Sequence, residues 1–196
     1  MRRKIIKLFS IGAFEKEEKW LTQMDAMGLR LLHVGYGNYT FEEAAPEGYV
    51  YRLELLDHMP SHPESQAYIR FVEETGAEYV GSIFRWVYFR KRAEEGDFEL
   101  FSDIDSKIRH YWRILSVSLA VSVIWLTLLC SDIASLLESA KSFSDWQYFS
   151  WDYWPKSMYN LIWIGRDIVI LCILQLLVSP IYKRLHQLKK MKKISE

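Results

Sequence analysis

The stretch ILSVSLAVSVIWLTLLCS, residues 114–131, decides the fold class, because it is a run of 18 residues without a charge. An α-helix rises about 1.5 Å per residue, so this stretch reaches about 27 Å, close to the ~30 Å hydrocarbon core of a bilayer. A buried core helix is the alternative, but no amphipathic break appears in the run. We therefore predict a first transmembrane helix within a juxtamembrane and membrane segment at residues 102–131.

A second apolar stretch ends at Tyr182 and is interrupted by Arg166 and Asp167. Residues 168–182 alone are short for a membrane span, and adding residues 161–165 gives enough length if the ionic residues lie near an interface. We therefore predict a second transmembrane helix at residues 161–182.

The two predicted spans place two opposite charges at similar depth. Counted from the inner ends of the helices, Arg166 and Asp132 differ in height by about 3 Å. We expect a membrane charge pair between them near the outer surface. A structural anchor is favoured over an intramembrane charge that moves or binds something.

Basic residues flank both spans on one side of the membrane. Lys107, Arg109 and Arg113 precede the first span, and the tail at residues 183–196 holds Lys183, Arg184, Lys189, Lys190, Lys192 and Lys193. The positive-inside rule predicts that both termini are cytoplasmic, and no export signal is visible. The tail residues either bind the inner leaflet, at about 1 kcal/mol each, or act only as stop-transfer charge.

The segment between the spans, residues 132–160, is predicted to be extracytoplasmic and is rich in aromatic residues. Its expected interfacial anchors are Trp146, Tyr148, Trp151, Tyr153 and Trp154. Rings with a polar edge settle at the headgroup level. An aromatic cage for an extracellular ligand is the alternative.

Residues 1–101 predict a cytoplasmic α+β domain with the order β-α-β-β-β-α-β-β, a small sandwich or a ferredoxin-like variant. The expected strands and helices cover residues 4–9, 14–27, 29–34, 38–42, 49–55, 61–76, 79–84 and 86–89. Gly28 is expected to end the first helix and Ser61 to cap the second. Phe71 is expected on the core side of the second helix, and Ser102 is expected to open the first membrane helix.

Charge and motifs exclude several classes of function. The formal net charge of zero argues against nucleic acid as a partner. His58 and His62 with Glu64 have a spacing that could bind zinc on one helix, but Pro60 lies between the histidines, so loop residues are the better interpretation. No Cys pair, HExxH motif or Gly-rich phosphate loop is present. We therefore expect no catalytic residues, no metal and no cofactor.

Several blocks of the chain resemble the domain-of-unknown-function 2812 family. They are the run Glu18-Lys19-Trp20-Leu21 followed by Met24, Gly28 and Leu31, then YVYRLE at residues 49–54, FRWVYFRK at 84–91 and LFSDIDSKIR at 100–109. The resemblance implies a bacterial membrane-associated protein that is often encoded beside a PadR-like transcriptional regulator. The family has no established catalytic residues to carry over.

These observations lead to three hypotheses of function. The first is a membrane-tethered regulatory or sensory module in the bacterial cell membrane, which contacts membrane lipids and binds a protein partner, with a link to transcriptional control. The second is a membrane-bound enzyme that acts on a lipid or envelope precursor. The third is an accessory subunit of a transporter, packed through Ser116, Ala120 and Ser122.

Overall fold

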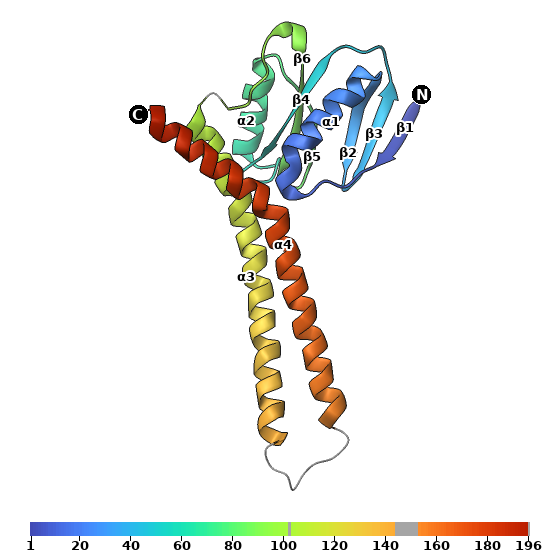
Figure 1. Cartoon of the computed structure of the whole chain (residues 1–196). Helices are drawn as coiled ribbons and strands as arrows, with labels where there is room; N and C mark the ends of the chain where they lie inside the picture. The colour runs from blue at the N-terminus through green and yellow to red at the C-terminus, as the bar shows by residue number, and fades with distance from the viewer. Residues whose placement is uncertain (102, 144–152, 196) are drawn as a thin grey trace. The chain divides into compact units, whose positions relative to one another are not determined.

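The computed structural model describes residues 1–101, 103–143 and 153–195 (Figure 1). The chain divides into two compact units. Unit 1 comprises Met1–Ile114 and Pro180–Glu196, and unit 2 comprises Leu115–Ser179. Unit 1 therefore contains the N-terminal domain together with the first turns of one long helix and the last turns of the other.

The domain has the predicted order β-α-β-β-β-α-β-β. Its elements are β1 (Arg2–Ile6), α1 (Phe14–Ala26), β2 (Leu29–Gly35), β3 (Asn38–Glu43), β4 (Tyr49–Leu55), α2 (Pro63–Glu74), β5 (Glu78–Ile83) and β6 (Trp86–Arg92). The α+β class and the element order are thereby confirmed.

The strands form two antiparallel sheets of three strands each, in the orders β1-β3-β2 and β4-β6-β5. Each sheet is therefore built from one strand–helix–strand–strand segment, with the last strand of the segment in the middle. This internal repeat was not predicted from the sequence. The sheets meet where β2 lies beside β5: there the Arg90 guanidinium donates to the Leu31 carbonyl oxygen at 3.1 Å, and the Leu31 N–H donates to the Tyr51 hydroxyl at 3.2 Å.

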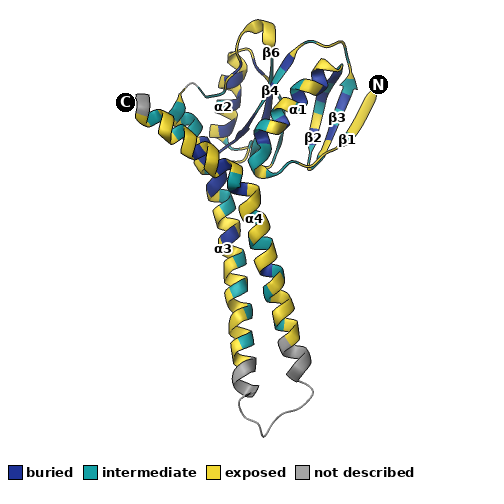
Figure 2. Cartoon of the chain, in the orientation of Figure 1, coloured by how far each residue is buried: buried dark blue, intermediate teal, exposed yellow. Residues whose placement is uncertain are grey.

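Helix α1 covers the junction by packing on β2 and β4. Its Leu21 is fully buried together with Phe41 and Tyr51 from the sheets, and burying one such side chain contributes about 1.5–3 kcal/mol. Phe89 of β6 belongs to a second core cluster, with Ile69 and Val72 of α2. The buried Asp25 accepts the Tyr49 N–H at 2.9 Å and so fixes the end of α1 to β4. Figure 2 shows buried residues on α1 and on the inner strands, whereas β1 is mostly exposed.

The second helix differs in two details from the sequence prediction. His62, not Ser61, is the N-cap of α2, and its ring accepts the Glu64 N–H through Nδ1 at 3.3 Å. Phe71 is 61% exposed, because Ile69 and Val72 set the buried face of this helix. A residue two positions from Ile69 lies about 200° around the helix, so Phe71 points outward.

The end of α1 and the start of α3 each have a local cause. Gly28 has φ +80°, a left-handed conformation that ends α1, and Met27 beside it is exposed. Helix α3 (Ile104–Phe143) is opened by Asp103, whose carboxylate accepts the Ser106 hydroxyl at 2.8 Å. Ser102 lies outside the described residues.

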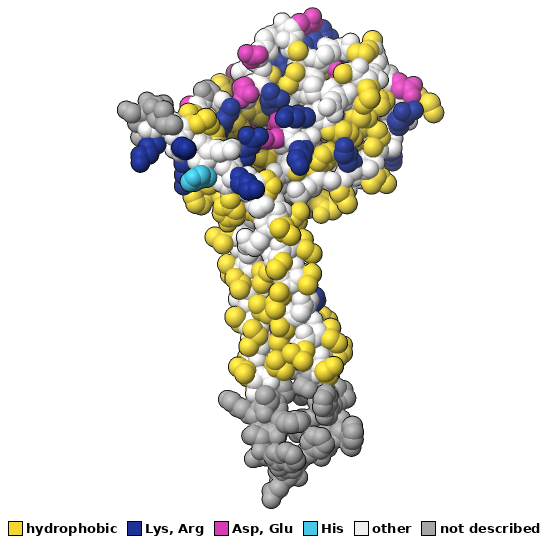
Figure 3. Space-filling view, in the orientation of Figure 1, with side chains coloured by type: hydrophobic (Ala, Val, Ile, Leu, Met, Phe, Trp, Pro, Cys, Tyr) yellow, Lys and Arg dark blue, Asp and Glu magenta, His cyan; other side chains and the backbone are white. Residues whose placement is uncertain are grey.

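Helices α3 and α4 (Tyr153–Ser195) are each long and apolar enough to cross a membrane. Within unit 2 their apolar side chains face outward: Leu119 is 63% exposed and Leu176 is 72% exposed, and Figure 3 shows hydrophobic side chains covering this part of the chain. A core helix of a soluble protein would bury such residues. The two helices are therefore compatible with two membrane spans.

The helices extend further than the predicted spans. Helix α3 continues to Phe143 and α4 begins at Tyr153, so the described parts of the segment between the predicted spans, residues 132–160, are helical. Pro180 lies inside α4, at the boundary between unit 2 and unit 1. A proline removes a backbone hydrogen bond from a helix.

Candidate functional site

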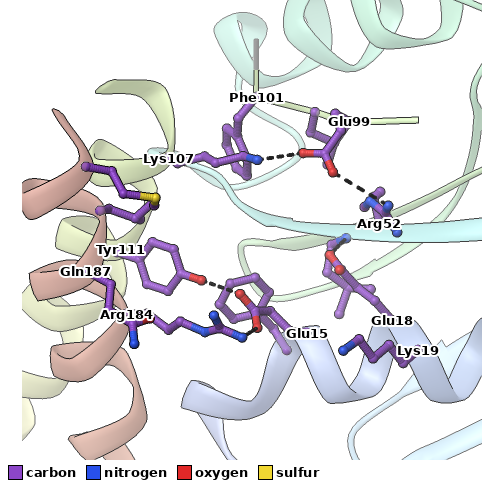
Figure 4. Close-up of a pocket in the computed structure, with 15 residues that line it drawn as sticks. Glu15, Glu18, Lys19, Arg52, Glu99, Phe101, Lys107, Tyr111, Arg184 and Gln187 are labelled. Carbon is purple, nitrogen blue, oxygen red and sulfur yellow. Dashed lines mark hydrogen bonds and ion pairs between the residues drawn. The ribbon is translucent and has the colours of Figure 1, made fainter. Parts of the chain in front are cut away.

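A pocket of about 340 Å³ opens in unit 1 beside α1, and Figure 4 shows the side chains around it. It is lined by α1, β4, the segment before α3, the first turns of α3 and the last turns of α4, through Phe14, Glu15, Glu18, Lys19, Arg52, Leu53, Glu99, Leu100, Phe101, Lys107, Tyr111, Arg184, Gln187, Leu188 and Met191. We call it the Glu18 pocket. Charges of both signs converge in it, on an apolar floor.

Glu15 joins three elements at the edge of the Glu18 pocket. It stands in the first turn of α1, accepts the Tyr111 hydroxyl of α3 at 2.5 Å and pairs with the Arg184 guanidinium of α4 at 3.2 Å. Hydrogen bonds to a charged group are stronger than neutral ones. Helix α1 is thereby bonded to the domain-side ends of both long helices (Figure 4).

Glu18 is the acid with the most perturbed surroundings in this pocket. Its Oε1 accepts the Leu53 N–H at 2.8 Å. Burial raises the pKa of Glu18 from 4.5 to about 7, although the Leu53 bond and the Arg52 charge act to lower it. The neighbouring carboxylates Glu15 and Glu99 raise this pKa further. Glu18 therefore exchanges its proton near neutral pH.

The opposite wall of the Glu18 pocket is a chain of ion pairs. Glu99 lies 2.8 Å from the Lys107 ammonium and 3.8 Å from the Arg52 guanidinium. Each partner is partly exposed, so these pairs contribute little to stability. They can be exchanged for a charged ligand at low cost.

The pocket can bind a charged or zwitterionic group and can exchange a proton through Glu18. None of its lining residues is a serine, threonine, cysteine or histidine, as far as the described part of the chain defines the lining. Hydroxyl, thiol and imidazole nucleophiles of these four types are therefore not among these lining residues, whereas carboxylates, lysines and a tyrosine are. The perturbed carboxyl group of Glu18 and the surrounding charges favour recognition or acid–base exchange.

The predicted inner-leaflet basic residues lie at the C-terminal end of α4, and several contact side chains of unit 1. Lys192 pairs with Asp105 at 2.8 Å, and the Lys189 ammonium lies 4.8 Å from the centre of the Trp112 ring. Arg184 bonds Glu15, as described above. Lys183 lines a second cavity beside α1. Lys190 and Lys193 are the other two basic residues at this end of α4. Sequence reasoning found these residues from charge but did not predict their partners.

In unit 2, Arg166 lies near Asp132, its predicted partner, and also near Asp167, its neighbour in the sequence. Its guanidinium lies 3.8 Å from Asp132 and 2.6 Å from Asp167, and it covers the Trp163 ring at 4.1 Å from the ring centre. Asp167 is fully buried, and its Oδ2 has no hydrogen-bond partner among the described residues. The closer partner of Arg166 is therefore its neighbour in the sequence.

The predicted aromatic anchors fall mainly on the part of the chain that the structure leaves undescribed. Trp146, Tyr148 and Trp151 lie outside the described residues. Tyr153 and Trp154 belong to the first turn of α4, where only the backbone is described. The anchor role stays a prediction.

His58, His62 and Glu64 come together at the start of α2, although the first two do not share a helical face. Their potential ligand atoms lie within 4.8 Å of one another, and all three side chains are exposed. The His62 Nδ1 already accepts a backbone N–H, and the His58 Nε2 lies 3.5 Å from Glu64. Capping and ion pairing account for the cluster.

The three small residues predicted to form a packing face for a transporter differ in their exposure in unit 2. Ser122 is 7% exposed and donates to the Ser118 carbonyl oxygen at 2.9 Å, whereas Ser116 and Ala120 are exposed. Residues 116 and 122 do not lie on one helical face. The three small residues therefore do not form one surface.

A known protein family matches more than half of this chain. Residues 13–123 match the family described as "Protein of unknown function (DUF2812)". This chain belongs to the DUF2812 family. The match covers α1, both sheets except β1, α2 and the first half of α3, and so includes Glu15, Glu18 and Tyr111 but not Arg184. No curated protein and no solved structure matches the chain.

Proposed function

We propose that this DUF2812 protein is a membrane-tethered regulatory or sensory module whose α+β domain lies in the cytoplasm and binds a protein partner. One observation carries the proposal: Glu15 of α1 bonds Tyr111 of α3 and Arg184 of α4 at the edge of the Glu18 pocket. A ligand or partner that displaces either bond changes how the domain holds the two long helices. The link to transcriptional control rests on the family resemblance.

Charge distribution supports the membrane orientation in this proposal. Three basic residues precede the apolar part of α3 and six follow that of α4, whereas the segment between has Lys141 and Lys156 against four acids. The positive-inside rule then puts both ends of the hairpin in the cytoplasm. The domain at residues 1–106 has 13 Lys and Arg against 19 Asp and Glu, so anionic lipid repels it and its surface stays available to a partner.

An exposed aromatic ring supports a protein partner. Phe71 is 61% exposed on the outer face of α2. Large aromatic side chains are enriched in protein interfaces, where they bury much area at low entropic cost. We therefore assign partner binding to the domain and not to the apolar helices.

Photo-crosslinking in native membranes tests the proposal. A benzophenone amino acid is placed at Phe71 on α2, at Met27 just after α1 and at Glu94 just after β6, three exposed positions. A discrete protein adduct from at least one position, resistant to a high-salt wash, is expected. Adducts with lipid alone from all three positions would contradict partner binding.

A second function is favoured by Glu18: a membrane-bound enzyme that acts on a lipid or envelope precursor. A carboxyl group with a pKa of about 7 in a polar pocket suits general acid–base catalysis near neutral pH. The variant Glu18→Gln separates the two functions. It abolishes the activity of an enzyme in cells, whereas it leaves the adducts of a partner-binding module in place.

A further inference from the structure

Another pocket in unit 1, of about 240 Å³, shares only Phe14 with the Glu18 pocket. Half of its lining residues are aromatic, and Phe9, Tyr36, Phe84 and Trp86 are among them. It contains a single carboxylate, Glu17. We call it the Glu17 pocket. An acid within a ring of aromatic faces is the arrangement that binds organic cations.

The carboxylate of Glu17 is held in place by two tyrosines. The hydroxyls of Tyr39 on β3 and Tyr88 on β6 both donate to Glu17 Oε1, each at 2.7 Å. The side chain is 7% exposed, and burial raises its pKa although both tyrosine bonds act against this. Both tyrosines bond the same oxygen, Oε1, and neither bonds Oε2. This oxygen is the one that can face a ligand in the pocket.

The protein already places one of its own cations on an aromatic ring of the pocket, Phe9, and on Trp20, which lies outside the lining. The Lys7 ammonium lies 5.1 Å from the centre of the Phe9 ring and 4.5 Å from that of Trp20. These distances are within the range for cation–π attraction. Lys7 lines the Glu17 pocket but is not ion-paired with Glu17 in the described structure. The rim therefore attracts positive charge while the carboxylate stays available.

We propose that the Glu17 pocket binds a small organic cation of the quaternary ammonium or alkylamine class, with Glu17 as counter-ion and the surrounding rings as its walls. The volume of about 240 Å³ is below the range for drug-sized ligands, so the cation is small. This site goes beyond the proposed function and stands on the pocket geometry alone. It is measured without a partner, so either conclusion can fail without the other.

The turn at the pocket supplies a second observation. Phe84 has φ +52°, which is unusual for a residue with a side chain, and its ring is 71% exposed among the pocket-lining residues. Glycine would adopt this conformation without strain. A phenylalanine here has a steric cost for the fold, and the cation site gives it a role as part of the aromatic wall.

The test is calorimetric titration of the full chain in dodecyl maltoside, a detergent without a quaternary ammonium group. The probes are choline and its uncharged isostere 3,3-dimethylbutan-1-ol. Choline is expected to bind at least tenfold more tightly than the isostere. Glu17→Gln keeps an acceptor for the tyrosines and is expected to weaken choline at least tenfold without changing the isostere. Glu73→Gln, the same change on an exposed face of α2, is expected to leave both unchanged.

The test also includes one further variant, Phe84→Gly, and one further ligand, glycerophosphocholine. Phe84→Gly removes the ring and the strain together, so it is expected to fold at least as well and to bind choline more weakly. Glycerophosphocholine carries the same cation on a larger, phosphate-bearing group, so a pocket for a small free cation is expected to bind it more weakly than choline. Equal binding of choline and its isostere, or full choline binding by Glu17→Gln, would overturn the proposal. Glycerophosphocholine binding as tightly as choline would overturn the assignment to a free cation and indicate a lipid headgroup.

Discussion

Replacing Glu18 by glutamine should stabilise the domain at alkaline pH and leave it unchanged at acid pH. In the unfolded chain Glu18 titrates near its ordinary pKa of 4.5, and in the folded domain near 7. Below pH 4.5 both states hold the proton, so the carboxyl has no effect. Between 4.5 and 7 only the folded state holds it, so stability falls as pH rises, and above 7 the full cost is reached.

The size of this cost follows from the two pKa values. At about 1.36 kcal/mol for each tenfold change in proton affinity, the difference gives about 3.4 kcal/mol as an upper limit. Glu18 is partly exposed, and solvent screening reduces this to about 1–2 kcal/mol. Glutamine keeps an amide oxygen for the Leu53 N–H, so the hydrogen bond is retained. For a domain of this size we expect a Tm increase of about 4–12 °C.

The assay is thermal unfolding in dodecyl maltoside, followed by near-ultraviolet circular dichroism of the domain aromatics, at pH 4.5 and pH 8.5. Glu73→Gln is the matched control, since this glutamate is exposed on α2. A Glu18→Gln protein with a lower Tm than the parent at pH 8.5 would refute the reasoning, because it would mean that the ionised carboxylate stabilises the fold. An equal gain at both pH values would also refute it.

Three further predictions concern single contacts. Arg166→Leu should destabilise the hairpin by about 2–3 kcal/mol in a detergent unfolding titration, because Asp167 then stays buried without its cation; Arg166→Leu with Asp167→Leu should recover most of this loss, and no recovery would show that the pair is not coupled. His62→Asp should raise the stability of the domain by about 0.5–1 kcal/mol, since aspartate is the better N-cap, and a lower Tm would contradict the capping role. Tyr111→Phe should reduce stability by about 1 kcal/mol by removing the hydroxyl from Glu15, whereas an unchanged Tm would show that this bond contributes nothing.

The element order of the domain could be predicted from the sequence because local signals are strong in it. Tyr49, Tyr51, Leu53 and Leu55 alternate along one face of β4, and the structure buries all four. Gly28 ends α1 in the left-handed conformation for which glycine is suited. Such signals act over a few residues, so they are readable without a structure.

The division into two sheets was not readable, because strand pairing joins residues far apart in the chain. Nothing local indicates that β3 lies between β1 and β2, or that β6 lies between β4 and β5. Phe71 was assigned to the core from its apolar character, yet the face set by Ile69 and Val72 excludes it. Periodicity over a short helix does not fix which residue of an apolar group turns outward.

The candidate sites depend on contacts across the fold and were missed for the same reason. Glu15, Glu17 and Glu18 read as acids of a first helical turn, a common pattern at helix starts. Their roles depend on residues that are distant in the chain. Arg184, which follows Glu15 by 169 residues, bonds Glu15, and Tyr39 and Tyr88 of the sheets bond Glu17. A signal that was available is the apolar position of Glu17, four residues before the buried Leu21.

The orientation of the hairpin is the claim on which the account of function rests most directly. Both native cysteines, Cys130 and Cys172, are free and can be replaced by alanine. Single cysteines at Ser144 and at Glu95 are then treated in intact spheroplasts with a membrane-impermeant maleimide. If the domain is cytoplasmic, Ser144→Cys is labelled at once, while Glu95→Cys is labelled only after the membrane is opened with detergent. Labelling of Glu95→Cys in sealed spheroplasts would put the domain outside the cell and contradict a cytoplasmic module.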